Sequence, residues 1–137
     1  MLSEHAFQSI SVGSDRRVWA ITSLGAPTLR HLISDENPDG AAWLLLDRPE
    51  GNPILRQISA GDTQVWVVDT NNRLYRRKDI VSILPEGTSW EFVAENVLHV
   101  SVGMNDQVRS GTPNFIPCHH LFYAVIYDCI LSRFGSC

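Results

Sequence analysis

Gln64-Val65-Trp66-Val67-Val68 decides the fold, because a second apolar segment with the same Val-Trp pair, Arg17-Val18-Trp19-Ala20-Ile21, stands 47 residues earlier. The surroundings of the two segments also match. Ile10-Ser11-Val12-Gly13 precedes the first segment, and Ile58-Ser59-Ala60-Gly61 precedes the second. A turn and another tryptophan follow each: Pro38-Asp39-Gly40 with Trp43, and Pro85-Glu86-Gly87 with Trp90. The chain therefore contains an internal duplication.

A third copy begins at Val100-Ser101-Val102-Gly103 and continues to Val108, but Arg109 takes the place of the next tryptophan. A period of about 40 to 50 residues, built from short apolar segments and glycine-bearing turns, is typical of β-propeller blades. Because a single blade cannot bury both of its apolar faces, we expect neighbouring copies to stack and form a common core.

Apolar and polar residues alternate in residues 8–12 and 98–102, as in strands with one face on a core. Residues 17–21 and 64–68 are more continuously apolar, which favours central strands. Glycines end the alternating strands, where we expect a tight turn with positive φ. Each period then supplies about four short strands, which make one blade.

The predicted fold is all-β: a partial β-propeller of about two and a half four-stranded blades, followed by a non-repeat C-terminal tail. The repeats occupy residues 7–109, divided into 7–53, 54–96 and an incomplete 97–109, and the divergent apolar tail occupies 110–137. The repeat-signature residues, all interpreted as structural, are Gly13, Trp19, Trp43, Gly61, Trp66, Trp90 and Gly103.

Three interpretations of the tail stay open. It forms a strand pair or helix that covers the open edge of the propeller, or it results from alternative splicing or truncation within the third blade, or it is an interfacial membrane segment. The loss of the repeat at Arg109, a tryptophan position, favours the second interpretation. The apolar stretch 121–131 contains Asp128 and is too short to cross a bilayer, so we expect no transmembrane segment.

Composition sets the broad class. The 137 residues are 44% apolar and 19% charged, which fits one globular domain, and the net charge of −4 argues against a nucleic-acid partner. Three cysteines confined to the tail (Cys118, Cys129 and Cys137) are not a disulfide framework. Residues 1–5 have no signal-peptide character, so we expect a cytoplasmic protein.

The second unit, residues 55–93, resembles the tectonin β-propeller repeat in Val65-Trp66-Val67-Val68, Leu74-Tyr75-Arg76-Arg77 and Pro85-Glu86-Gly87-Thr88-Ser89-Trp90. The strand Val100-Ser101-Val102-Gly103 of the next unit also fits the pattern. The first unit departs from it, with Pro27-Thr28-Leu29-Arg30 at the third strand. The resemblance covers about three quarters of the chain and leaves out the tail.

This resemblance is greatest to the intracellular tectonin β-propeller repeat-containing proteins linked to autophagy. It implies a non-enzymatic scaffold in autophagosome maturation or membrane traffic, whose partners are proteins of that machinery, in the cytoplasm or peripherally on autophagosomal or lysosomal membranes. The alternative that it implies is a lectin for carbohydrate or lipopolysaccharide. A structural repeat indicates fold more strongly than function.

Catalysis and metal binding find little support. The five histidines are scattered, and no serine or cysteine lies in a nucleophile-elbow context, so we expect neither an enzyme nor a cofactor. Cys118, His119 and His120 are adjacent, and neighbouring strand residues point to opposite sides, which disfavours a shared metal ion.

Arg73, Arg76, Arg77 and Lys78 form the basic cluster. Charge of this kind protects an outer strand from edge-to-edge pairing, and the alternative is a patch for acidic lipid headgroups or an acidic partner. Trp43 and Trp90 each stand three residues before an aliphatic residue, a pattern that can dock ubiquitin-like modifiers, but their repeat positions favour core packing.

The blade-connecting loops at residues 14–16, 62–64 and 105–106 are the predicted binding surface. Closed propellers typically have 4 to 8 blades, so fewer than three blades leave two blade faces exposed. We therefore expect marginal stability as a monomer, or self-association through those faces.

Overall fold

The structure, a computed structural model, describes residues 6–31, 33–103 and 105–111, and every regular element in that part of the chain is a strand except for one 3-10 turn. The strands are β1 (Phe7–Val12), β2 (Val18–Thr22), β3 (Pro27–His31), β4 (Ala42–Leu45), β5 (Leu55–Ala60), β6 (Val65–Asp69), β7 (Leu74–Arg77), β8 (Trp90–Ala94), β9 (His99–Val102) and β10 (Val108–Gly111), with η1 (Ser14–Arg16) between β1 and β2.

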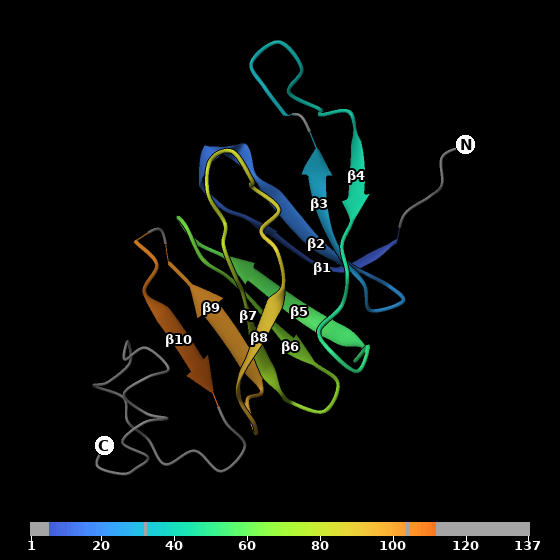
Figure 1. Ribbon diagram of the computed structural model, residues 1–137, viewed down its shortest axis with the longest axis vertical. Helices are drawn as coiled ribbons and strands as arrows, with labels where there is room; N and C mark the ends of the chain where they lie inside the picture. The colour runs from blue at the N-terminus through green and yellow to red at the C-terminus, as the bar shows by residue number, and fades with distance from the viewer. Residues whose placement is uncertain (1–5, 32, 104, 112–137) are drawn as a thin grey trace.

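The strands form two four-stranded antiparallel meanders and a two-stranded start of a third (Figure 1). The first sheet has the order β1-β2-β3-β4 and the second β5-β6-β7-β8, while β9 pairs with β10. The first strand pair of each four-stranded sheet carries an irregularity at the same place, between Phe7 and Ser9 and between Leu55 and Gln57. The predicted all-β, partial-propeller fold is confirmed.

Neighbouring blades bury apolar faces against one another, as a repeat array requires. One core cluster joins Trp19 and Ile21 of the first blade to residues of the second, and another joins Trp66 and Val68 of the second blade to β9 and β10. Trp19 and Trp66 are both 1% exposed. The matched tryptophans therefore occupy equivalent environments, each facing the following blade.

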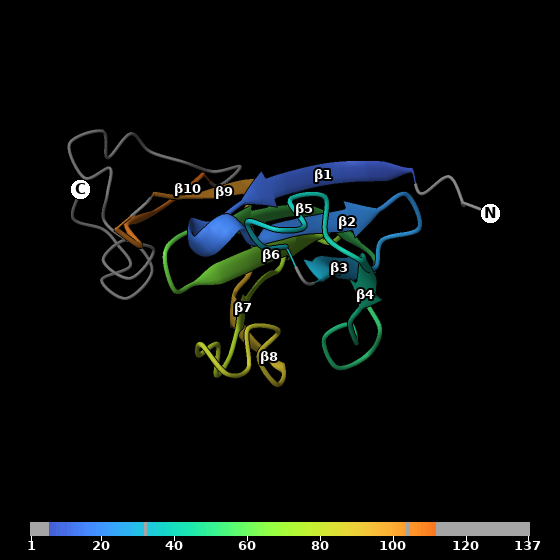
Figure 2. The same cartoon turned by 90° about the horizontal axis from the view of Figure 1, so that it is seen from above.

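The first strands of the three units lie along one side of the molecule, with β4 and β8 toward the other (Figure 2). Side chains of one inner strand bind the backbone of the next. Ser11 Oγ accepts a hydrogen bond from Ala60 N (2.9 Å), and the equivalent Ser59 Oγ accepts one from Val102 N (2.9 Å). The alternating polar positions of the sequence thus connect blade to blade.

The glycines that end the inner strands have a different role from the one predicted. A turn follows each of Gly13, Gly61 and Gly103, but none of the three has a positive φ, so the predicted reason for glycine is wrong. A Cβ on Gly13 would lie 2.8 Å from the carbonyl oxygen of Gly61, and a Cβ on Gly61 would lie 2.8 Å from that of Gly103. Glycine is needed at positions 13 and 61 because successive blades approach too closely there for a side chain.

The repeat is less uniform than the tryptophan spacing suggests. Four residues separate Gly13 from Val18 but three separate Gly61 from Val65, because the first loop contains η1. Despite its departure from the pattern, the segment Pro27–His31 forms β3, where Pro27 is the first residue of the strand.

The third unit continues in β10 to Gly111, past the predicted boundary at residue 109. The remaining tail, with its cysteines and adjacent histidines, lies outside the described residues, and the domain boundaries stay predictions. Among the residues described, no helix is long and apolar enough to cross a membrane.

Candidate functional site

The four basic residues of the predicted cluster lie in different environments on the second blade. Arg73 is exposed in the turn between β6 and β7, and Lys78 is exposed just after β7. Arg76 is half-buried and pairs with Glu91 of β8, with 2.6 Å between Nη2 and Oε1. Arg77 is buried, with 6% of its surface exposed. The structure therefore does not bring all four together as one surface patch.

Arg77 belongs to a structural motif that both blades repeat. Its guanidinium lies 4.9 Å from the ring centre of Trp90, and its Nε donates to the carbonyl oxygen of Glu86 (2.7 Å). In the first blade, Arg30 lies 5.4 Å from the ring centre of Trp43 and donates to the carbonyl oxygen of Asp39 (2.7 Å). Each arginine thus fixes the Pro-acid-Gly turn to its tryptophan by a cation–π contact and a hydrogen bond.

Burial lowers the pKa of Arg77 below its ordinary value, and the negative charges of Asp47 and Glu86 partly offset this effect. Its Nη1 is buried and has no hydrogen-bond partner among the described residues. A buried donor without a partner costs free energy, so this atom calls for an explanation.

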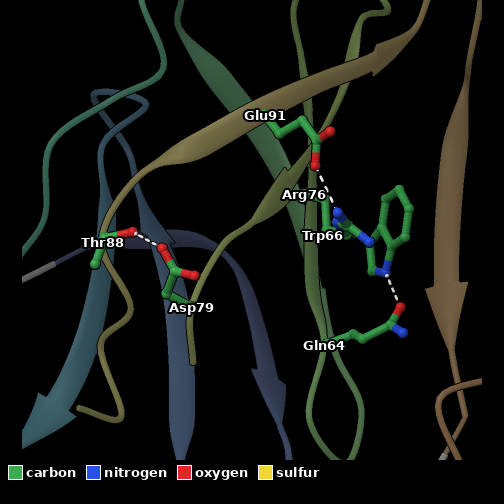
Figure 3. A network of polar contacts seen from close by, with 6 residues as sticks. All are labelled: Gln64, Trp66, Arg76, Asp79, Thr88 and Glu91. Carbon is green, nitrogen blue, oxygen red and sulfur yellow. Dashed lines mark hydrogen bonds and ion pairs between the residues drawn. The ribbon is translucent and has the colours of Figure 1, made fainter. Parts of the chain in front are cut away.

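A polar network surrounds Arg76 (Figure 3). Its guanidinium lies 5.9 Å from the ring centre of Trp66, whose Nε1 donates to Gln64 Oε1 (3.0 Å). Nearby, Thr88 Oγ1 donates to Asp79 Oδ2 (2.6 Å). Because Trp66 occupies the amide oxygen of Gln64, the amide nitrogen points away from the tryptophan, as Figure 3 shows.

A hollow of about 290 Å³ lies between the β5–β6 loop and the end of β7. Its lining residues are Thr63, Gln64, Arg76, Arg77, Lys78, Asp79 and Ile80. Three of them are cationic, and two carboxylates, those of Asp79 and of Glu91 paired with Arg76, oppose them. Asp47 and Glu86 also act on the charge of Arg77, so the exposed positive charge of this feature is that of Lys78; we name the feature the basic hollow.

A second pocket, of about 380 Å³, lies between the linker that follows β4 and the outer strands of the second blade. We name it the aromatic pocket; it is lined by Pro49, Glu50, Arg73, Tyr75, Trp90, Phe92 and Glu95. Phe92 is 52% exposed and contacts Tyr75 edge to face, with 5.9 Å between ring centres.

Tyr75 is anchored beneath this pocket by the buried carboxylate of Asp69. Its hydroxyl donates to Asp69 Oδ2 (3.2 Å), while Asp69 Oδ1 accepts from the backbone N–H of Asn71 (2.8 Å) and Arg73 (2.9 Å). Burial, and next the charge of Asp69, raise the pKa of the Tyr75 phenol above its ordinary value.

The predicted binding loops lie next to one another, but many of their groups bind each other. Ser14 Oγ donates to the carbonyl oxygen of Asp62 (2.9 Å). The carboxylate of Asp106 accepts from the backbone N–H of Asp62 (2.7 Å), Thr63 (2.9 Å) and Gln64 (3.2 Å). These contacts hold neighbouring blades together at one end of the array.

Trp43 and Trp90 are half-buried on the outer strands β4 and β8. Trp90 packs against the core between the first two blades and donates to the carbonyl oxygen of Asp47 (2.8 Å). Among the described residues, no group of three or more histidines, cysteines or carboxylates is placed to hold a metal ion.

Sequence reasoning missed the arginine–tryptophan motif, although its signal was present in Arg30 and Arg77 at the same spacing as the tryptophans. It also missed the two pockets. No sequence signal marks them, because each combines a loop or linker with strands that the chain reaches only later.

Comparison with known proteins supports this architecture. A family model described as Propeller (Hyd_WA) matches residues 64–93. Tectonin beta-propeller repeat-containing protein 1 of Mus musculus is 38% identical over 137 aligned residues, which take in 66% of this chain. The chain spans 12% of the length of that relative.

Two solved structures are similar in fold. YCF48 from Cyanidioschyzon merolae has a TM-score of 0.53 and 17% identity, over 82% of this chain and 33% of that protein. Human WBSCR16 has a TM-score of 0.51 and 14% identity, over 72% of this chain and 30% of that protein.

Four-stranded meanders that stack through equivalent tryptophans define a β-propeller protein. The family model and the mouse relative support the tectonin β-propeller repeat family, so the resemblance drawn from the sequence is confirmed.

Proposed function

We propose that the chain is a non-enzymatic interaction scaffold in autophagosome maturation or membrane traffic. The observation that carries the proposal is the division of residues between the two blades. Repeated residues such as Trp19 and Trp66 pack the core, whereas the second blade adds Arg76, Lys78 and Phe92 where the first has Leu29, His31 and Leu45. Residues that the fold does not repeat are available for recognition.

The autophagy assignment rests on the resemblance to intracellular tectonin proteins, and the similarity to the mouse tectonin beta-propeller repeat-containing protein supports the repeat family. We propose a cytoplasmic location, peripheral on autophagosomal or lysosomal membranes, with proteins of the autophagy machinery as partners. Acidic lipid headgroups are a further candidate ligand for the exposed cations Arg73 and Lys78.

Exposed apolar side chains on the first blade support self-association. Ile10 and Val12 are 57% and 61% exposed, whereas their equivalents Ile58 and Ala60 are 3% and 6% exposed against the preceding blade. We propose that this face also docks a blade, and that it causes association at high concentration.

Proximity labelling in cultured cells tests the scaffold function. The labelling enzyme is fused to the full chain, and the same enzyme without the chain is the control. Enrichment of autophagosomal or lysosomal membrane proteins that rises on starvation supports the proposal. A labelled set equal to that of the control contradicts it.

The aromatic pocket favours a second candidate function, a carbohydrate-binding lectin. The rings of Trp90 and Phe92, above the buried Tyr75, offer apolar surface to a pyranose, while Arg73 and Glu95 offer a donor and an acceptor for its hydroxyl groups. Aromatic walls with a few polar groups are typical of small-molecule sites.

A glycan array separates the lectin from the scaffold. Reproducible sugar binding that is lost in Phe92→Ala supports the lectin. Leu45→Ala is the matched control, because Leu45 has the position of Phe92 in the first blade and is likewise exposed. No sugar binding, or equal loss in both variants, contradicts the lectin function.

A further inference from the structure

We propose that the basic hollow binds a carboxylate side chain of an acidic segment in a partner protein. This inference rests on the proposed scaffold function and names the chemistry of one partner. It uses Arg76, Arg77 and Lys78 and leaves out Arg73, which lines the aromatic pocket instead.

Comparison of the blades indicates that the hollow is not a by-product of the fold. Strand register places Arg76 opposite Trp66, where the first blade has Leu29 opposite Trp19. Leu29 is buried against its tryptophan, whereas Arg76 lies over its tryptophan and reaches Glu91. The second blade therefore holds a charge at a position that the first blade fills with an apolar side chain.

Arg77 supplies an independent observation. Its repeated contacts, the tryptophan ring and the turn carbonyl, use one face of the guanidinium and Nε. Nη1 has no partner, although the residue is more than nine-tenths buried and lines the hollow. Asp47 and Glu86 offset part of the cost of burying this charge, and an anion in the hollow would add to that offset, because opposite charges attract more strongly away from water.

Charge and size favour a single carboxylate over a membrane surface. The hollow presents the exposed charge of Lys78, and Asp79 and Glu91 beside it would face a flat anionic surface with like charge. The whole chain carries a net charge of −4, which also opposes adsorption to anionic lipid. An acidic side chain entering the hollow avoids these repulsions.

Binding of rhodamine-labelled hexaglutamate to the full chain, followed by fluorescence anisotropy, tests the proposal. Hexaglutamine is the uncharged probe, and phosphatidylserine–phosphatidylcholine vesicles are the membrane probe. The informative variant is Lys78→Gln, and the matched control is Arg73→Gln, since each removes one exposed positive charge from the same blade. Circular dichroism verifies that both variants keep their strand content.

We expect hexaglutamate to bind, hexaglutamine not to bind, and Lys78→Gln to weaken binding about three- to fivefold, the effect of one exposed charge contact. Arg73→Gln should leave binding unchanged. Equal weakening in both variants would mean that only net charge matters and would overturn the proposal. Sedimentation with the vesicles in the absence of hexaglutamate binding would also overturn it, in favour of lipid.

The two proposals fail separately. If Lys78→Gln still labels the same autophagosomal proteins in cells as the unchanged chain, the scaffold stands and the hollow is not its contact. If hexaglutamate binds selectively but no membrane-traffic protein is labelled, the hollow stands and the scaffold function is wrong.

Discussion

Replacing Gly61 by alanine separates the two explanations of the repeated glycine. A Cβ at Gly61 would clash with Val102 Cγ1, and it would lie 2.7 Å from Asp106 Oδ1 and 2.8 Å from the carbonyl oxygen of Gly103. A Cβ at Gly103 would meet nothing nearer than 3.5 Å. If a turn required these glycines, both substitutions would be costly. If close packing requires them, only Gly61→Ala is costly.

The expected magnitude follows from these distances. Overpacking typically costs about 1–3 kcal/mol. Moving the Asp106 carboxylate also weakens its hydrogen bonds to the β5–β6 loop, which are worth roughly 1–3 kcal/mol with a charged acceptor. We therefore expect Gly61→Ala to lower the free energy of unfolding by about 3 kcal/mol. Gly103→Ala should raise it by about 0.4–1 kcal/mol, because alanine restricts the unfolded chain.

Urea unfolding of the full chain, followed by tryptophan emission and far-ultraviolet circular dichroism, measures both values. For a slope near 2 kcal/mol per M, Gly61→Ala moves the midpoint down by about 1.5 M. Equal destabilisation by the two substitutions would refute the close-approach explanation. So would a Gly61→Ala protein as stable as the unchanged chain.

The remaining predictions concern the loops, the buried phenol and the open blade face. Asp106→Asn should lower the free energy of unfolding by about 1–2 kcal/mol and speed hydrogen exchange of the Asp62 amide, whose acceptor is weakened; unchanged exchange would contradict the role given to this carboxylate. The pKa of Tyr75 is raised in the folded chain from an ordinary 10.0, by burial first and then by Asp69, so the unfolded chain loses this proton first. The contribution of Tyr75 to the free energy of unfolding is fully present below pH 10 and decreases as the pH rises further. The free energy of unfolding of Tyr75→Phe should therefore fall less steeply above pH 10 than that of the unchanged chain, and identical pH profiles would contradict this prediction. Replacing Ile10 and Val12 by threonine should lower the apparent mass of the chain at high concentration, measured by size-exclusion chromatography with light scattering; association that persists undiminished would show that another surface is responsible.

The order of elements could be predicted because the repeat constrains it twice. Val65-Trp66-Val67-Val68 alone is compatible with a buried strand or a short helix. Its copy at Val18–Ile21, with a glycine before each and a Pro-acid-Gly turn after each, leaves a four-stranded unit as the common solution. The repeat even predicted a blade in the first unit, where β3 forms with Pro27 and Thr28 in place of Leu74 and Tyr75.

Contacts across blades could not be predicted with the same success. Position 61 requires glycine because the backbone of Gly103 lies so close to it. That distance is set by the stacking of the blades, which no local sequence pattern encodes. The two pockets depend on the same geometry. Glu50 joins Phe92 in the aromatic pocket only because the linker after β4 runs beside β8.

Repetition also explains why counting charges in Arg73–Lys78 overestimates the basic surface. Arg77 has a counterpart in Arg30, and both stack on a tryptophan and bind a turn carbonyl, so the fold itself requires this charge. Lys78 has the position of His31, and the contact that the two blades repeat there is made by the backbone carbonyl, which accepts from Thr88 in the second blade and from Ala41 in the first. A substitution at Arg77 therefore reports chiefly on stability, whatever the hollow binds. A substitution at Lys78 leaves the shared motif intact and reports on binding, which makes it the residue on which the proposed partner chemistry is decided.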